Sequence, residues 1–133
     1  MRQLHFQPIA GKALDILDTI LHTPEVASCK EVFGDVRMVC EELVVNVVDY
    51  AYPDRTDGYL DVEIEKDEHA ITIRLKDGGV AFNPLEVGAP DITKPLEERQ
   101  IGGLGIFIML KKMDSVSYEY TDSENILTIK KWL

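Results

Sequence analysis

The chain has 133 residues, 45% of them hydrophobic and 29% charged, which is the size and composition of one globular domain, so residues 1–133 are expected to form a single unit. No apolar run is long enough to span a membrane and residues 1–8 lack a signal-peptide stretch, so the sequence indicates a cytoplasmic protein with no membrane association. The formal net charge of −10 disfavours direct binding to nucleic acid, whose phosphates it repels, and favours partners with basic surfaces.

The first half of the chain has one strand-like segment followed by helical patterns. Residues 4–6 alternate between apolar and polar side chains, which predicts a short first strand. Apolar residues recur at helical spacing over 11–22 and again over 32–48, where Pro53 ends the second pattern. Gly34 is a position at which this second helix could kink or divide.

Two hairpins are predicted in the second half. Apolar and polar residues alternate over 59–65 and 70–75, and again over 116–120 and 126–129, with polar turns between the members of each pair. Consecutive hairpins imply antiparallel pairing with the helices stacked on one face of the sheet, an α+β arrangement. Between the hairpins lie a segment rich in glycine, proline and charge and a short apolar helix, over 78–102 and 104–113.

Three groups of residues carry possible chemistry, and the first is on the second predicted helix. Glu42 and Asn46 stand four residues apart, so their side chains project from the same face. An amide oxygen such as that of Asn46 suits Mg²⁺, and the Glu42 carboxylate suits a base that accepts a proton from an attacking hydroxyl or water. A solvated polar stripe has the same spacing, so the pair alone does not establish a site.

The second group follows the strand predicted over 70–75. Asp77 is followed by Gly78 and Gly79, and glycines permit close backbone approach to a planar ligand. The carboxylate can accept a hydrogen bond from an exocyclic amine, such as that of adenine. A plain Asp-Gly turn without a ligand accounts for the same residues.

The third group opens the helix predicted over 104–113. This segment is three glycines and one leucine: Gly102, Gly103, Leu104 and Gly105. Such small residues expose backbone N–H groups at the start of a helix, where the helix dipole favours phosphate groups. The segment is not a dinucleotide fingerprint, because a third glycine and a preceding strand are missing.

In this order and at this separation, the three groups resemble the ATP-binding domain of the GHKL superfamily, shared by gyrase, a heat-shock chaperone, histidine kinases and the mismatch-repair protein MutL. They match its helix box, its Asp-x-Gly box and its Gly-x-Gly box, at Glu42/Asn46, Asp77/Gly79 and Gly103/Gly105. Finer features resemble the stand-alone anti-sigma-factor serine/threonine kinases: Ala51-Tyr52, Phe82-Asn83-Pro84 and the segment 103–108.

The resemblance implies the Bergerat ATP-binding fold, a two-layer α+β sandwich of a mixed, mostly antiparallel sheet with helices on one face and an ATP lid over about 83–101. It implies that Asp77 holds the adenine amine, that Gly79 lets the ring approach and that Asn46 ligates Mg²⁺. By the same resemblance, the backbone N–H groups of Gly103, Leu104 and Gly105 are expected to donate hydrogen bonds to the phosphates. Val80 and Phe107 are expected either to form walls of the pocket or to belong to the core.

The resemblance also implies an activity. Glu42 is expected to act as general base for phosphoryl transfer from ATP to a serine of an anti-anti-sigma partner, a protein of the STAS type. A sigma factor is the second expected partner. Because relatives are commonly homodimers, a homodimer is a further expectation.

Some positions depart from the resemblance and leave an alternative open. Tyr50 stands where relatives often carry His, Ile101 stands where some carry Arg, and residues 125–126 replace a Thr that is common near the adenine aspartate. Retention of Glu42 favours a kinase, whereas Tyr50 and Ile101 favour a catalytically weak module that senses nucleotide and switches a partner. A detached ATP domain of a histidine kinase is disfavoured by the small size and by residues 82–84.

Overall fold

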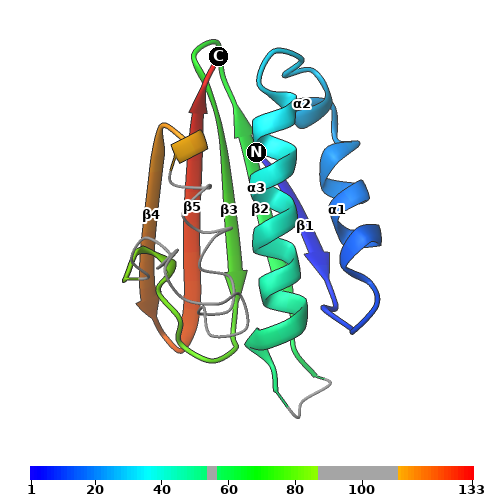
Figure 1. The fold of residues 1–133 in the computed structure, drawn as a ribbon, viewed down its shortest axis with the longest axis vertical. Coiled ribbons are helices and arrows are strands. Elements are labelled where there is room, and N and C mark those ends of the chain that lie inside the picture. Colours follow the sequence, from blue (N-terminus) through cyan, green and yellow to red (C-terminus); the bar gives the residue numbers. More distant parts are fainter. Residues whose placement is uncertain (54–56, 87–110) are drawn as a thin grey trace, which may run out of the picture.

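A five-stranded sheet forms one layer of the molecule and helices form the other (Figure 1). The structure is a computed structural model that describes residues 1–53, 57–86 and 111–133. The strands follow the order β1-β2-β3-β5-β4, and all four pairings among these described strands are antiparallel. They are β1 (Arg2–Phe6), β2 (Leu60–Lys66), β3 (Ala70–Asp77), β4 (Ser115–Thr121) and β5 (Glu124–Trp132).

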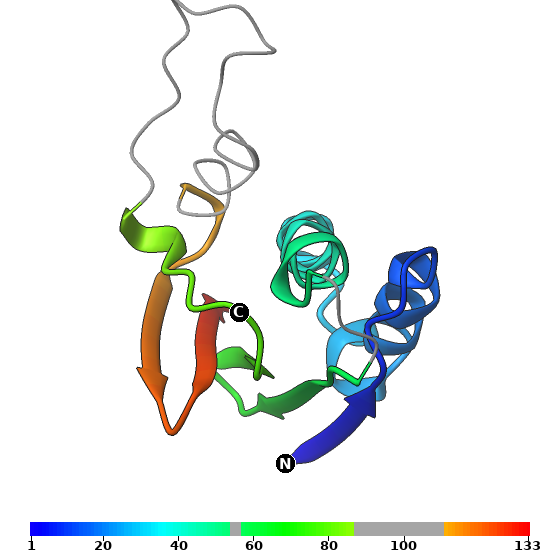
Figure 2. The same ribbon diagram turned by 90° about the horizontal axis from the view of Figure 1, so that it is seen from below.

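The helices lie together on one face of this sheet, as the view in Figure 2 shows for α1 and α3. They are α1 (Ala13–Leu21), α2 (Pro24–Ala27) and α3 (Phe33–Asn46), and a π-helical turn, η1 (Val47–Ala51), continues α3. A short 3-10 turn, η2 (Pro84–Glu86), lies beyond β3. The predicted two-layer α+β fold is confirmed. Among the described residues, no helix is long and apolar enough to cross a membrane.

Two local features differ from the prediction. The helical patterns over 11–22 and 32–48 leave no helix between them, yet Pro24 begins the short helix α2, where the missing N–H of proline costs nothing in the first turn. Gly34 lies in the first turn of α3 and does not divide the helix. The long helical pattern instead changes from α-helix to π-helix after Asn46.

The core lies between the sheet and the helices. On β3 and β5 every second side chain is buried, so the apolar rows of both strands face α1 and α3. These rows pack against the apolar faces of the helices in one cluster, whose largest fully buried members include Leu17, Ile20, Val36, Val39, Ile71, Ile73 and Ile129.

The same alternation carries two polar residues onto the buried face. In the β3–β5 register Ile73 lies opposite Ile129, Leu75 lies opposite Leu127 and, at the end of the ladder, Asp77 lies opposite Asn125. Asp77 and Asn125 are 7% and 6% exposed. Burying polar groups is costly unless they are hydrogen-bonded, so this end of the sheet is where a functional site is expected.

Candidate functional site

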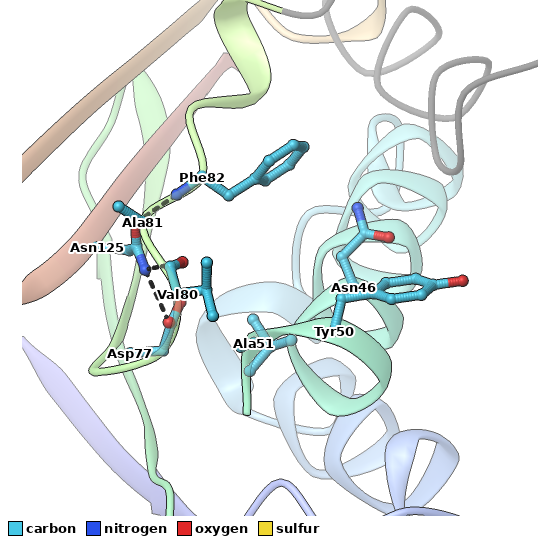
Figure 3. A pocket seen from close by; sticks show the side chains of 9 residues that line it. Asn46, Tyr50, Ala51, Asp77, Val80, Ala81, Phe82 and Asn125 are labelled. Atoms are coloured by element: carbon cyan, nitrogen blue, oxygen red, sulfur yellow. Dashed lines mark hydrogen bonds between the residues drawn. The ribbon is translucent and has the colours of Figure 1, made fainter. Parts of the chain in front are cut away.

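A cavity of about 300 Å³ opens between the end of the α3–η1 helix and the segment that follows β3 (Figure 3). Its volume is at the lower end of the range of small-molecule sites. Helix, strand end and loop all contribute to its lining: Asn46, Val47, Tyr50, Ala51, Asp77, Val80, Ala81, Phe82 and Asn125. Three of the predicted site residues, Asn46, Asp77 and Val80, are therefore brought together in one cavity.

Glu42 and Asn46 share one face of α3, as their spacing predicts. Asn46 lines the cavity, whereas Glu42 lies one turn earlier, half-buried and outside the lining. Burial raises the pKa of Glu42, a side-chain hydrogen bond with Asn46 opposes this rise, and the neighbouring charge of Glu41 adds to it. Asn46 therefore lies at the cavity, with Glu42 one turn away on the same face of α3.

The Asp77 carboxylate is held by one of its two oxygens. Oδ1 accepts hydrogen bonds from the Gly79 N–H and from Asn125 Nδ2, each at 3.0 Å. No described residue donates to Oδ2, which leaves this oxygen available to a ligand in the cavity. Burial raises the pKa of Asp77, and the hydrogen bonds from Asn125 and Gly79 oppose that rise.

Gly79 packs against the end of the helix. A Cβ built on it would lie 2.2 Å from the Ala51 carbonyl oxygen and 2.7 Å from the Ala51 carbonyl carbon. The next residue fixes this approach, because the Val80 N–H donates a 2.8 Å hydrogen bond to the same oxygen. The close approach that Gly79 permits in this structure is thus to Ala51, and Gly79 is not part of the cavity lining.

Replacing Gly79 with alanine should lower the free energy of unfolding by about 1–3 kcal/mol, the usual cost of overpacking. The added methyl group meets backbone atoms of Ala51, so the loop must move and the hydrogen bond from Val80 is strained. Urea denaturation measures the change. Gly34→Ala is the matched control, because its Cβ meets nothing within 4 Å and its stability should stay equal or rise. Equal stabilities of the two variants would contradict the close contact.

Tyr52 ties the same loop to the start of β2. Its hydroxyl donates to the Tyr59 carbonyl oxygen at 2.6 Å and accepts from the Gly78 N–H at 2.7 Å. Both glycines that follow Asp77 are therefore fixed from the helix side, Gly78 through Tyr52 and Gly79 through Ala51. The Ala51-Tyr52 pair that the sequence singles out positions the Asp-x-Gly segment.

Exposed apolar side chains surround the cavity. Val80 is 57% exposed, Phe82 is 47% exposed and Tyr50 is 48% exposed, and all three contribute to its lining. Large apolar groups at the mouth of a pocket suit a flat, partly apolar ligand. Other predicted positions lie outside the described residues: Gly102, Gly103, Leu104, Gly105, Phe107 and the lid residues 87–101.

Sequence reasoning did not assign six of the lining residues to the site, and Asn125 is the most buried polar residue among them. A signal for it exists in the sequence. The alternation of β5 puts Leu127 and Ile129 on the buried face, and the same alternation places Asn125, a polar residue, on that face. Tyr50 and Ala51 reach the cavity from the π-helical turn, whose departure from α-helical spacing the sequence does not reveal.

Comparisons with known proteins agree with the fold. Among solved structures, the catalytic domain of the histidine kinase ThkA superposes with a TM-score of 0.56 at 12% identity, over 99% of this chain and 97% of that domain. A histidine kinase domain from Erythrobacter litoralis gives a TM-score of 0.52 at 16% identity, over 76% of this chain and 44% of the other. At these identities the likeness concerns the fold.

Curated relatives are more similar in sequence. Serine-protein kinase RsbW of Listeria monocytogenes serovar 1/2a is 29% identical over 104 residues, which are 75% of this chain and 66% of that kinase, slightly less than two thirds. Anti-sigma F factor of Clostridium novyi is 30% identical over 108 residues, 76% of this chain and 71% of that protein. The profile of the family described as "Histidine kinase-like ATPase domain" matches residues 10–131. The chain therefore belongs to the histidine kinase-like ATPase domain family, of the GHKL type.

Proposed function

We propose that residues 1–133 form one nucleotide-binding unit that binds ATP together with Mg²⁺. The observation that carries this proposal is the Asp77 carboxylate, which is buried at a cavity with one oxygen held by the protein and the other left without a donor among the described residues. An acceptor fixed in this way suits the exocyclic amine of adenine. Membership of the ATPase domain family supports the same ligand.

The rest of the lining fits a nucleotide. Val80 and Phe82 extend from the loop after β3 into the gap that separates the loop from α3 (Figure 3), where a purine ring has apolar surface to contact. On the helix side, the Asn46 amide oxygen is a hard donor of the kind that Mg²⁺ takes. Bound Mg²⁺ supplies charge neutralisation to the phosphates. Backbone N–H groups of Gly102, Gly103, Leu104 and Gly105 and the wall residue Phe107 complete the proposed site.

The proposed reaction is protein serine/threonine phosphorylation. As the substrate hydroxyl oxygen bonds to the γ-phosphorus of ATP, the Glu42 carboxylate accepts the hydroxyl proton, and the bond from phosphorus to the β–γ bridging oxygen breaks to release ADP. A raised pKa suits Glu42 to this role, since a stronger base accepts the proton more readily. The relatives named serine-protein kinase support protein phosphorylation as the reaction.

The proposed partners follow from the same relatives. One is named serine-protein kinase and another is named anti-sigma F factor, which supports a STAS-type anti-anti-sigma protein as substrate and a sigma factor as binding partner. A homodimer is the assembly we propose, and the cytoplasm, where sigma factors act, is the proposed location. The net charge of −10 favours basic surfaces on these partners.

The kinase proposal is tested by incubating the chain with γ-labelled ATP, Mg²⁺ and a STAS-domain protein from the same genome. Label transferred to a serine or threonine of the partner supports the kinase. Magnesium-dependent ATP binding with no transfer to any STAS protein of that genome supports the second candidate, a nucleotide-sensing module. Tyr50, which lines the cavity four residues after Asn46, is the observation that favours this second candidate.

Replacing Asn46 with alanine should remove the dependence of ATP affinity on Mg²⁺. The reason is that the variant lacks the amide oxygen that we assign to the metal, while Asp77 and the apolar lining stay in place. Titration of ATP with Mg²⁺ and then with a chelator measures the effect, and the chelator series is the internal control. An N46A variant with the same Mg²⁺ dependence as the wild type would exclude Asn46 as the ligand.

A further inference from the structure

Asn125 is the most connected polar side chain of the cavity. Its Nδ2 donates to Asp77 Oδ1 and to the Val80 carbonyl oxygen, both at 3.0 Å, with the Gly79 carbonyl oxygen farther away at 3.4 Å. Its Oδ1 accepts from the Phe82 N–H at 3.1 Å and from the Tyr118 hydroxyl. One amide thus joins the end of β3 and the loop that follows it (Figure 3), and through the Tyr118 hydroxyl it also reaches the edge strand β4.

These contacts occupy both ends of the amide. The two N–H groups of an asparagine amide are matched by Asp77 and Val80, and its carbonyl oxygen has two lone pairs, matched by Phe82 and Tyr118. Asn125 is also 6% exposed. Although the residue lines the cavity, its polar atoms are therefore committed to the protein rather than to a ligand.

The geometry fixes the orientation of the Asp77 carboxylate. The two donors to Asp77 within the described part of the chain, the Gly79 N–H and Asn125 Nδ2, converge on Oδ1. Turning the carboxylate out of this orientation breaks two hydrogen bonds to a charged acceptor in a buried position, which is costly. The opposite oxygen, Oδ2, which accepts no hydrogen bond from a described residue, is then fixed in position in a residue that lines the cavity.

Resting on the ATP site proposed above, we propose that Asn125 is a positioning residue for base recognition. It presents Asp77 Oδ2 to the ligand and holds the loop that carries Val80 and Phe82 as one wall of the cavity. A threonine at this position has one O–H donor and could not serve Asp77 and Val80 together. Asparagine thus gives this chain a way to select the base through Asp77, without a direct contact of its own.

Asn125→Leu removes every one of these side-chain hydrogen bonds and keeps a side chain that branches at the same carbon. With Mg²⁺ present, the wild type should bind ATP more tightly than ITP, whose base carries a carbonyl oxygen in place of the amine. In N125L this ATP-to-ITP preference should fall at least tenfold, because Asp77 is no longer oriented. A merely structural role would weaken both nucleotides equally and leave the ratio unchanged, which would overturn the inference.

Thr128→Val is the matched control. Thr128 lies three residues along β5 on the opposite face of the sheet, where its hydroxyl accepts a hydrogen bond from Arg74 Nε at 3.2 Å. Its variant should keep the wild-type preference for ATP. If the wild type itself binds neither nucleotide, the proposed function fails; if the wild type discriminates and N125L discriminates equally, only the role of Asn125 fails.

A second measurement, made without nucleotide and with a milder variant, tests whether Asn125 holds the loop that carries Val80 and Phe82. In Asn125→Ser, the side chain is too short to reach the Phe82 N–H, so hydrogen exchange at this amide should become at least tenfold faster than in the wild type and in T128V. This expectation holds even if N125L does not fold. Unchanged exchange at Phe82 would show that Asn125 does not hold the loop and would overturn the proposal.

Discussion

Replacing Glu42 with glutamine should slow phosphoryl transfer to the protein substrate by about 10²–10⁴-fold, the usual contribution of a general base. Affinity for ATP should stay close to that of the wild type, because Glu42 does not line the cavity in which the nucleotide is proposed to bind. Single-turnover transfer of labelled phosphate and calorimetric titration of ATP measure the two quantities separately.

Unfolding does not explain such a loss. Burial is the main cause of the raised pKa of Glu42, so the folded protein disfavours the charged form, and a neutral glutamine should be at least as stable. The matched control is Glu41→Gln, which alters the neighbouring carboxylate, an exposed partner of Arg37 at 3.7 Å. E41Q should transfer phosphate at the wild-type rate. Normal transfer by E42Q would exclude Glu42 as the base.

Replacing Asp77 with asparagine should weaken ATP binding by roughly 10- to 150-fold, which corresponds to the loss of a hydrogen bond to a charged group worth about 1.5–3 kcal/mol. The asparagine Oδ1 can still accept from Gly79 and Asn125, so its Nδ2 takes the place of Oδ2. A donor then faces the adenine amine, which is also a donor. ITP carries an acceptor at this position, so the preference for ATP over ITP should shrink or reverse.

Competition titration of ATP and ITP with Mg²⁺ measures this preference. Asp61→Asn provides the control, since Asp61 is an aspartate on β2 that pairs with His5, away from the residues that line the cavity. D61N should leave both affinities unchanged. An unaltered ATP affinity in D77N would mean that the adenine ring is not bound at Asp77.

Much of the fold is predictable because it depends on local periodicity. The alternation of apolar and polar side chains over 70–75 predicts β3 and its buried face. Continued for two more residues, the same alternation places Asp77 on the buried face, at the cavity. The helical spacing of Glu42 and Asn46 likewise places both on one face of α3. These patterns need no knowledge of distant contacts, which is why the antiparallel sheet and the layer of helices follow from the sequence.

The remaining features depend on contacts between distant segments. The role of Gly79 as a contact of Ala51 requires knowing that the loop after β3 meets the end of the helix. Asn125 meets Asp77 across 48 residues of sequence, through a strand register that no single segment specifies. The π-helical turn that brings Tyr50 to the cavity is likewise a departure from the regular spacing on which sequence reading depends.

The central claim is that this cavity binds ATP with Mg²⁺, and calorimetric titration of the wild-type chain tests it most directly. ATP and ADP are each titrated with Mg²⁺ and with a chelator. Saturable binding of both nucleotides at one site per chain, tighter with Mg²⁺ than without it, is the result we predict. No heat of binding for either nucleotide with Mg²⁺, from a chain shown to be folded, would contradict the nucleotide site and leave the family fold without its ligand.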